Sequence, residues 1–311
     1  MDHQGHGLVL NHAIFTTPNK VSFPTVATPR EKHYAGATSV LYPQGMPETC
    51  QLVAFERDKA DDWNPILVNH EGFFTDVPGL ENLAEGHSGK CLGSVSLVRQ
   101  GRWFYWGYAI DPERMTAPAA DTLVNVLHYM RGQRAAQTTR FVCVTRQLLT
   151  VYLDLFRESG YRRGIEEHLP GQLTPEWRKT YTPTPEGCRA WLDQHLPYVF
   201  SGKSDAHRSD RYKTIFEVDP DAMALGTPNK ERSSLEKWLA LAAGQAGEDH
   251  DRALLCLARY VHPSIAPKDG DWAKWYAAQK ARIAFIESTG FWWQEDPRVL
   301  ERELRAGKTG K

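Results

Sequence analysis

Short apolar runs separated by glycine and proline occupy the first half of the chain. Residues 94–98 alternate between polar and apolar side chains, and the aromatic run of residues 103–106 follows after the turn sequence Arg99-Gln-Gly-Arg102. Two such runs joined by a glycine-containing turn are typical of a β-hairpin. Similar runs predict further strands over residues 51–55, 65–68 and 139–144.

The helix predicted after this hairpin has clear boundaries. Thr116 is a suitable N-cap, and Pro118 falls in the first turn, where its missing N–H costs nothing. Apolar residues recur at helical spacing along one face, which we expect to be buried, and Gly132 marks the end. These apolar positions are Leu123, Val126, Leu127 and Met130. A second helix is predicted over residues 147–158.

From about residue 161 the pattern changes to a proline-rich stretch and then to helices. Residues 228–242 and 249–261 each carry one apolar face and are predicted to form an αα-hairpin. A helix over residues 271–287, capped by Asp269 or Asp271, places Trp272 and Trp275 on one face as core anchors. A short aromatic strand at 290–293 and a frayed tail at 304–311 complete the prediction.

The fold class expected from this pattern is α/β. Residues 1–160 are predicted to form an α/β domain, and residues 161–311 a mostly helical C-terminal domain. A length of 311 residues fits two domains at about 150 residues each.

Charge and hydropathy exclude several classes of protein. The chain has 37 Lys and Arg against 38 Asp and Glu, a formal net charge of −1, so no large basic surface for nucleic acid is expected. No apolar run is long enough to span a membrane. The first residues lack the pattern of a signal peptide, which indicates a cytoplasmic protein, or a piece or mature form of a longer one.

The cysteines and glycines do not indicate a cofactor. Five cysteines occur without a CxxC pair, so no metal site is predicted, and a disulfide between Cys50 and Cys91 is expected only if the protein is exported. Neither a P-loop nor a GxGxxG sequence is present, so no nucleotide cofactor is expected.

Three neighbouring segments carry a family resemblance. They are Ser94-Val-Ser-Leu-Val98 with Gly101-Arg-Trp-Phe-Tyr-Trp-Gly107, then Asp111-Pro112 with Met115-Thr116, then Leu123-Val-Asn-Val-Leu-His-Tyr129. Together they resemble the last strands and closing helix of trehalose-utilisation (ThuA)-like domains, which belong to the class I glutamine amidotransferase-like superfamily. The resemblance implies a partial flavodoxin-like sandwich.

The second half resembles the helical tail of planctomycete-type proteins in which a ThuA-like segment comes first. This likeness rests on residues 216–229, 254–260, 271–276 and 290–292. The family resemblance implies an exported, periplasmic protein with further chain upstream. The first strands of the sandwich would then be missing, and the open sheet edge would need a homo-oligomeric partner or an upstream segment to cover it.

Candidate catalytic residues follow the predicted strand 65–68. His70 could act as a base and Glu71 could orient it, with His87 approaching from a glycine-containing loop. A His-Glu pair at a strand end is also a common loop hydrogen-bonding pair. Cys91 lacks the following helix of an amidotransferase elbow, and the His3, His6 and His12 cluster fits a chain terminus better than a metal site.

Two functions remain open at this stage. The first is a degenerate amidotransferase-like module with a binding or assembly role and no catalysis. The alternative is a hydrolase acting on a carbohydrate-type or other small polar substrate through His70, Glu71 and His87.

Overall fold

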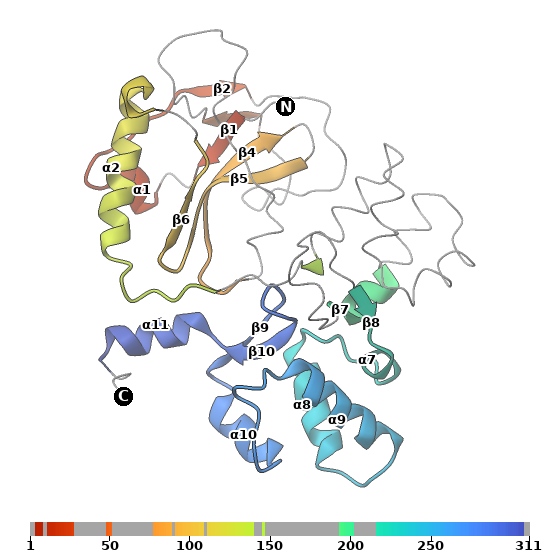
Figure 1. Ribbon diagram of the computed structural model, residues 1–311. Helices are drawn as coiled ribbons and strands as arrows, with labels where there is room; N and C mark the ends of the chain where they lie inside the picture. The colour runs from red at the N-terminus through yellow and green to blue at the C-terminus, as the bar shows by residue number, and fades with distance from the viewer. Residues whose placement is uncertain are drawn as a thin grey trace, which may run out of the picture. The chain divides into compact units, whose positions relative to one another are not determined.

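The computed structural model describes residues 4–8, 11–27, 48–51, 77–88, 91–108, 111–139, 145–146, 193–201 and 216–307. The chain divides into two compact units (Figure 1). Unit 1 comprises residues 1–139 together with 301–311, and unit 2 comprises residues 140–300. The boundary predicted after residue 160 lies outside the described residues, as do the strand predicted at 65–68 and the helix predicted at 147–158. Of the strand predicted at 139–144, only Thr139 is described.

Unit 1 contains a four-stranded sheet in which every neighbouring pair is antiparallel. Its order is β1 (Gln4–Leu8), β4 (Glu81–Ser88), β5 (Cys91–Gln100) and β6 (Trp103–Trp106). The predicted hairpin is confirmed, because β5 and β6 pair from Gln100 opposite Trp103. A separate antiparallel ribbon joins β2 (Thr25–Ala27) to β3 (Thr49–Gln51), which contains Cys50 as a buried free thiol.

The hairpin turn depends on glycine. Gly101 has φ +59°, and the backbone of residues 137–139 passes directly over it. A Cβ at this position would lie 2.0 Å from the carbonyl oxygen of Gln137. Hydrogen bonds from Arg102 N to Thr138 Oγ1 (3.1 Å) and from Gln100 Nε2 to Thr139 O (2.9 Å) hold the crossing segment in place.

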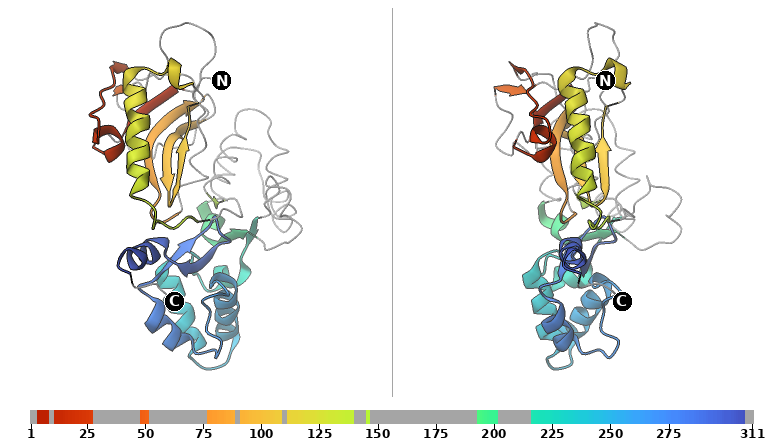
Figure 2. Two further views of the ribbon diagram at one scale, coloured as in Figure 1. Left: turned by 60° about the vertical axis from the view of Figure 1, so that its left-hand side comes forward. Right: turned by 90° about the vertical axis from the view of Figure 1, so that its left-hand side faces the viewer.

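Helix α2 (Ala117–Arg131) covers the sheet, as Figure 2 shows, and follows the short turn η2 (Pro112–Arg114). Thr116 caps it as predicted, with Oγ1 accepting from Ala119 N. Ala119 and Val126 on its inner side belong to the same hydrophobic core as the β6 residues Phe104 and Trp106. The predicted stripe is wrong at Leu127, which is 62% exposed, because Ala119 and Val126 take the central buried positions.

Helix α1 (Ala13–Thr16) is held beside α2 by one buried amide. The side chain of Asn125 accepts from Asn19 N (2.9 Å) and donates to Asn19 O (2.7 Å) and Ile14 O (3.1 Å). These three bonds satisfy backbone groups within the short helix and just after it, so the N-terminal segment is fixed to α2.

Unit 2 contains the predicted αα-hairpin, α8 (Arg232–Ala242) and α9 (Glu248–Tyr260). Around it lie η3 (Leu196–Tyr198), β7 (Val199–Ser201), β8 (Phe216–Val218) and α7 (Pro220–Ala224). Trp238 of α8 stacks on Tyr260 of α9, with ring centroids 5.4 Å apart and both rings fully buried.

The predicted helix over residues 271–287 is correct only in its first half. Helix α10 (Trp272–Gln279) begins at the Asp271 cap, and Trp272 and Trp275 pack edge to face as core anchors. The chain then forms β9 (Ile283–Ile286), which pairs with the aromatic strand β10 (Trp292–Glu295). Helix α11 (Pro297–Arg305) includes the first residues of the predicted tail, and residues 308–311 lie outside the described residues.

We expect Gly101→Ala to lower the free energy of unfolding of unit 1 by about 3 kcal/mol, from left-handed backbone strain and a clash with the chain crossing it. Gly132→Ala is the matched control, because its φ of −74° suits any residue and the one close neighbour of its added Cβ, Tyr129 O at 3.3 Å, needs to shift by only a few tenths of an ångström. The control should change stability by less than about 0.5 kcal/mol in urea denaturation. Equal losses would contradict the role assigned to the turn.

Candidate functional site

The residues predicted to be catalytic are not brought together in the described structure. His70 and Glu71 lie outside the described residues. His87 lies in β4 opposite Gln4, not in a loop, and its side chain is not described. Cys91 begins β5 and pairs with Ser88, so no helix follows it as an amidotransferase elbow requires.

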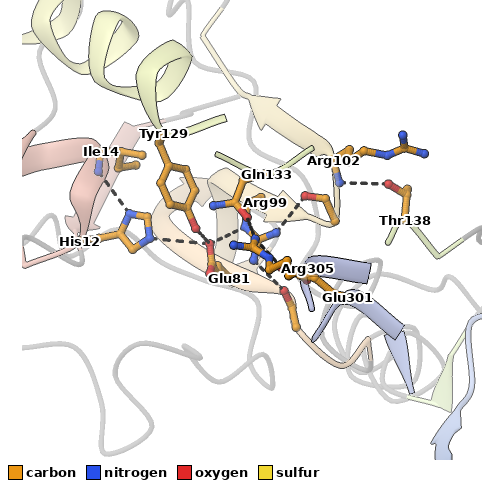
Figure 3. A network of polar contacts seen from close by, with 12 residues as sticks. His12, Ile14, Glu81, Arg99, Arg102, Tyr129, Gln133, Thr138, Glu301 and Arg305 are labelled. Carbon is orange, nitrogen blue, oxygen red and sulfur yellow. Dashed lines mark hydrogen bonds and ion pairs between the residues drawn. The ribbon is translucent and has the colours of Figure 1, made fainter. Parts of the chain in front are cut away.

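The structure instead assembles a polar cluster around Glu81, the first residue of β4 (Figure 3). Arg99 Nε donates to Glu81 Oε2 at 2.6 Å, and the Tyr129 hydroxyl donates to the same oxygen at 2.7 Å. His12 Nε2 lies 3.7 Å from it. These four residues come from four separate segments of unit 1, so a single carboxylate oxygen ties the unit together.

Each member of the Glu81 cluster is positioned by local structure. Arg99 faces Glu81 because the two residues are direct partners in the β4–β5 register. Its remaining nitrogens donate to Gly101 O (2.9 Å) and Gly79 O (3.3 Å). Tyr129 projects from α2, with its ring 4.8 Å from the His12 ring.

His12 is also the N-cap of α1, and this role fixes its tautomer. Its Nδ1 accepts a hydrogen bond from Ile14 N at 3.3 Å. The ring proton of neutral His12 is therefore on Nε2, the nitrogen that faces Glu81. The lone pair needed by a general base is engaged in capping the helix.

The protonation states of the cluster follow from its contacts. Burial alone would raise the pKa of Glu81, but hydrogen bonds from Arg99 and Tyr129 outweigh it and lower that pKa below its usual value. Burial and the bond to Glu81 raise the pKa of Tyr129 to about 12. At neutral pH the carboxylate is ionised and the phenol is protonated, so the shared proton stays on Tyr129.

Burial also lowers the pKa of His12, while Glu81 opposes and Arg99 reinforces the shift. His12 is therefore neutral at pH 7. Glu81 is thus an ionised acceptor held by Arg99 and Tyr129, and the basic nitrogen of His12 is already occupied. This arrangement stabilises the structure rather than transferring protons.

Unit 2 has a second polar cluster, centred on the fully buried Asp219. Its Oδ1 accepts from Asp221 N (2.9 Å) and Ala222 N (3.2 Å), which caps α7. Its Oδ2 accepts from the Tyr260 hydroxyl (2.7 Å) and from Arg259. All the acceptor sites of this carboxylate are thus occupied within the chain.

Unit 2 also contains a buried thiol and a buried ion pair. Burial and nearby Asp219 raise the pKa of the Cys256 thiol, so it stays protonated and is a poor nucleophile. Arg146 and Glu287 form a buried ion pair in which Arg146 N and Nε each donate to a different carboxylate oxygen at 2.8 Å.

Comparison of the chain with protein-family models, with curated proteins and with solved structures found no match. Within the residues that the structure describes, no group of three or more His, Cys, Asp or Glu side chains is arranged to hold a metal ion. Among the described helices, none is long and apolar enough to cross a bilayer.

Sequence reasoning missed the centre of the Glu81 cluster. It noted His12 as part of a terminal histidine group but did not single out Glu81, Arg99 or Tyr129. The signal that could have revealed it is the opposite charge of Glu81 and Arg99, which face each other across β4 and β5. Residues 81–88 were not predicted as a strand, because two glutamates and a glycine are unusual in strands.

We expect His12→Asn to flatten the pH dependence of stability. Because the folded state lowers the pKa of His12, the unfolded chain binds the proton more readily, and stability falls as pH drops below about 6.5. Asn retains the cap but does not titrate. Urea midpoints of the two proteins should differ in slope between pH 5 and about 6.5 and run parallel above it. Parallel curves over the whole range would refute a neutral, buried His12.

We expect Tyr260→Phe to lower the free energy of unfolding of unit 2 by about 1–3 kcal/mol, because buried Asp219 and Asn229 each lose a partner. The matched control is Tyr276→Phe, whose hydroxyl bonds to Glu236 at an exposed site. It should cost less than about 0.5 kcal/mol in the same calorimetric measurement. A control loss as large as that at Tyr260 would contradict the importance of the Asp219 cluster.

Proposed function

We propose that this chain is a degenerate amidotransferase-like module that acts in binding or assembly rather than in catalysis. The observation that carries the proposal is that the carboxylates of Glu81 and Asp219 are both held by donors of the same chain. Both carboxylates accept from donors of the same chain, and the base nitrogen of His12 caps a helix. Within the residues that the structure describes, such groups hold a scaffold, and a scaffold acts through its surface.

The proposed fold relationship is a partial flavodoxin-like, ThuA-like sandwich. Its support is local: β5, β6, η2 and α2 follow one another in the order that the resemblance implies. The described sheet is antiparallel, whereas the central sheet of a flavodoxin-like sandwich is parallel. The relationship is therefore proposed for the closing segment of the sandwich only.

The hydrolase alternative depends on His70, Glu71 and His87. The structure does not describe their side chains. Turnover that depends on His70 distinguishes this alternative from the proposal.

The test combines mass and turnover measurements on the full chain. Light scattering after size exclusion at high protein concentration should give a mass above the chain mass of 35.3 kDa. A panel of chromogenic glycosides and esters should show no turnover that differs between the wild type and His70→Gln. Turnover that is present in the wild type and lost in His70→Gln would establish the hydrolase and overturn the proposal.

A further inference from the structure

The outer side of α2 carries a second apolar stripe, away from the side packed on the sheet. Val124 and Leu127 are 48% and 62% exposed, and Ala117 and Ala120 are exposed before them on the same side. Together with Arg131 they have the spacing i, i+3, i+7, i+10 and i+14. This is the spacing of the contact positions in a two-helix coiled coil.

The exposed charges at the two ends of α2 differ in sign. Asp111 and Glu113 precede the helix, with Arg114 beside them, whereas Arg131 and Arg134 lie at and just beyond its last turn. The N-terminal end is net acidic and the C-terminal end is basic. Such a helix complements a copy of itself that runs in the opposite direction.

We propose that the outer stripe of α2 binds the same stripe of a second copy of the chain, antiparallel, to form a weak homodimer. This inference rests on the proposed assembly function and identifies its partner and surface. In an isologous pair, residue i contacts residue j and residue j contacts residue i. The twofold axis then passes between Ala120 and Val124 of each helix.

In this arrangement each large side chain faces a small one, and the acidic end of each helix lies near the basic end of the other. Ala117 lies opposite Leu127 of the second copy, and Ala120 lies opposite its Val124, so each large side chain faces a small one. The acidic turn η2, which includes Glu113, then lies at the same end of the pair as the basic end of α2 of the second copy, which includes Arg131. A parallel pair would instead place alanine against alanine and like charges together, which leaves gaps and repulsion.

The size of the surface sets the strength of the dimer. A helix of 15 residues is about 22 Å long, so the pair buries less than about 1,200 Å² in total. Interfaces of that size belong to weak complexes, and we expect association that depends on concentration in the micromolar to millimolar range.

The first experiment is sedimentation equilibrium of the full chain from about 1 μM to about 1 mM. The wild type should fit a monomer–dimer equilibrium, and Leu127→Glu should raise the Kd about tenfold or more by placing a charge against Ala117 of the second copy. Leu255→Glu is the matched control, because Leu255 is 51% exposed on α9 of unit 2. Its Kd should equal that of the wild type.

The second experiment tests the antiparallel orientation by exchanging charges at the two ends of the pair. Glu113→Arg or Arg131→Glu alone should raise the Kd about fivefold, because symmetry creates two like-charge contacts per dimer. The double exchange should return the Kd to within about twofold of the wild type. All these positions are exposed, and unchanged circular dichroism and melting temperature confirm that the variants fold.

Three outcomes overturn the inference. If the chain assembles but none of the α2 variants changes the Kd, the surface is wrong while the assembly function stands. If the double exchange is no better than either single exchange, the antiparallel orientation is wrong. If the wild type stays monomeric at every concentration, both the dimer and the assembly function fail, and a lower melting temperature of Leu127→Glu would then assign the stripe to a contact within the chain.

Discussion

Unit 1 depends on keeping one half-buried carboxylate ionised. Withdrawing Glu81 from water costs free energy, and that cost is offset only while Arg99 and Tyr129 both donate to it. Arg99 belongs to β5 and Tyr129 to α2, so satisfying one oxygen fixes the register of a hairpin and the rotation of a helix together. His12 adds the N-terminal segment to the same centre. The charge thereby specifies an arrangement that apolar packing alone would leave less defined.

The fixed rotation of α2 divides the helix into sides with different tasks. One side presents Ala119 and Val126 to the sheet, and a neighbouring side presents Asn125 to the α1 segment. Folding uses both of these and leaves Val124 and Leu127 exposed to solvent. Large apolar residues at consecutive coiled-coil positions contribute little to folding there, and their placement is better explained by contact with another surface.

The sequence was informative where the determinants are local. A glycine turn predicted the β5–β6 hairpin, and Thr116, Pro118 and Gly132 set the ends of α2. The prediction was wrong where contacts between separate segments determine the structure. The helix predicted to extend to Glu287 ends at Gln279, because the residues after it form β9, which pairs with β10. Leu127 has the right spacing for burial, yet the four-residue stripe is wider than the face that the sheet covers. The Glu81 cluster joins residues far apart in the sequence, and no periodicity within one segment records such a contact.

The carboxylates of Asp219 and Glu81 differ in how much they depend on the rest of the fold. Asp219 accepts two of its four hydrogen bonds from backbone N–H groups two and three residues ahead. The first turn of α7 therefore provides half of its donors locally. Glu81 receives its donors from β5 and α2, and any local opening that separates these elements leaves the carboxylate without partners. Local opening therefore exposes the polar centre of unit 1 more readily than that of unit 2. A partner that binds only folded α2 stabilises unit 1 by mass action, so assembly would strengthen the unit whose polar centre is the more easily opened.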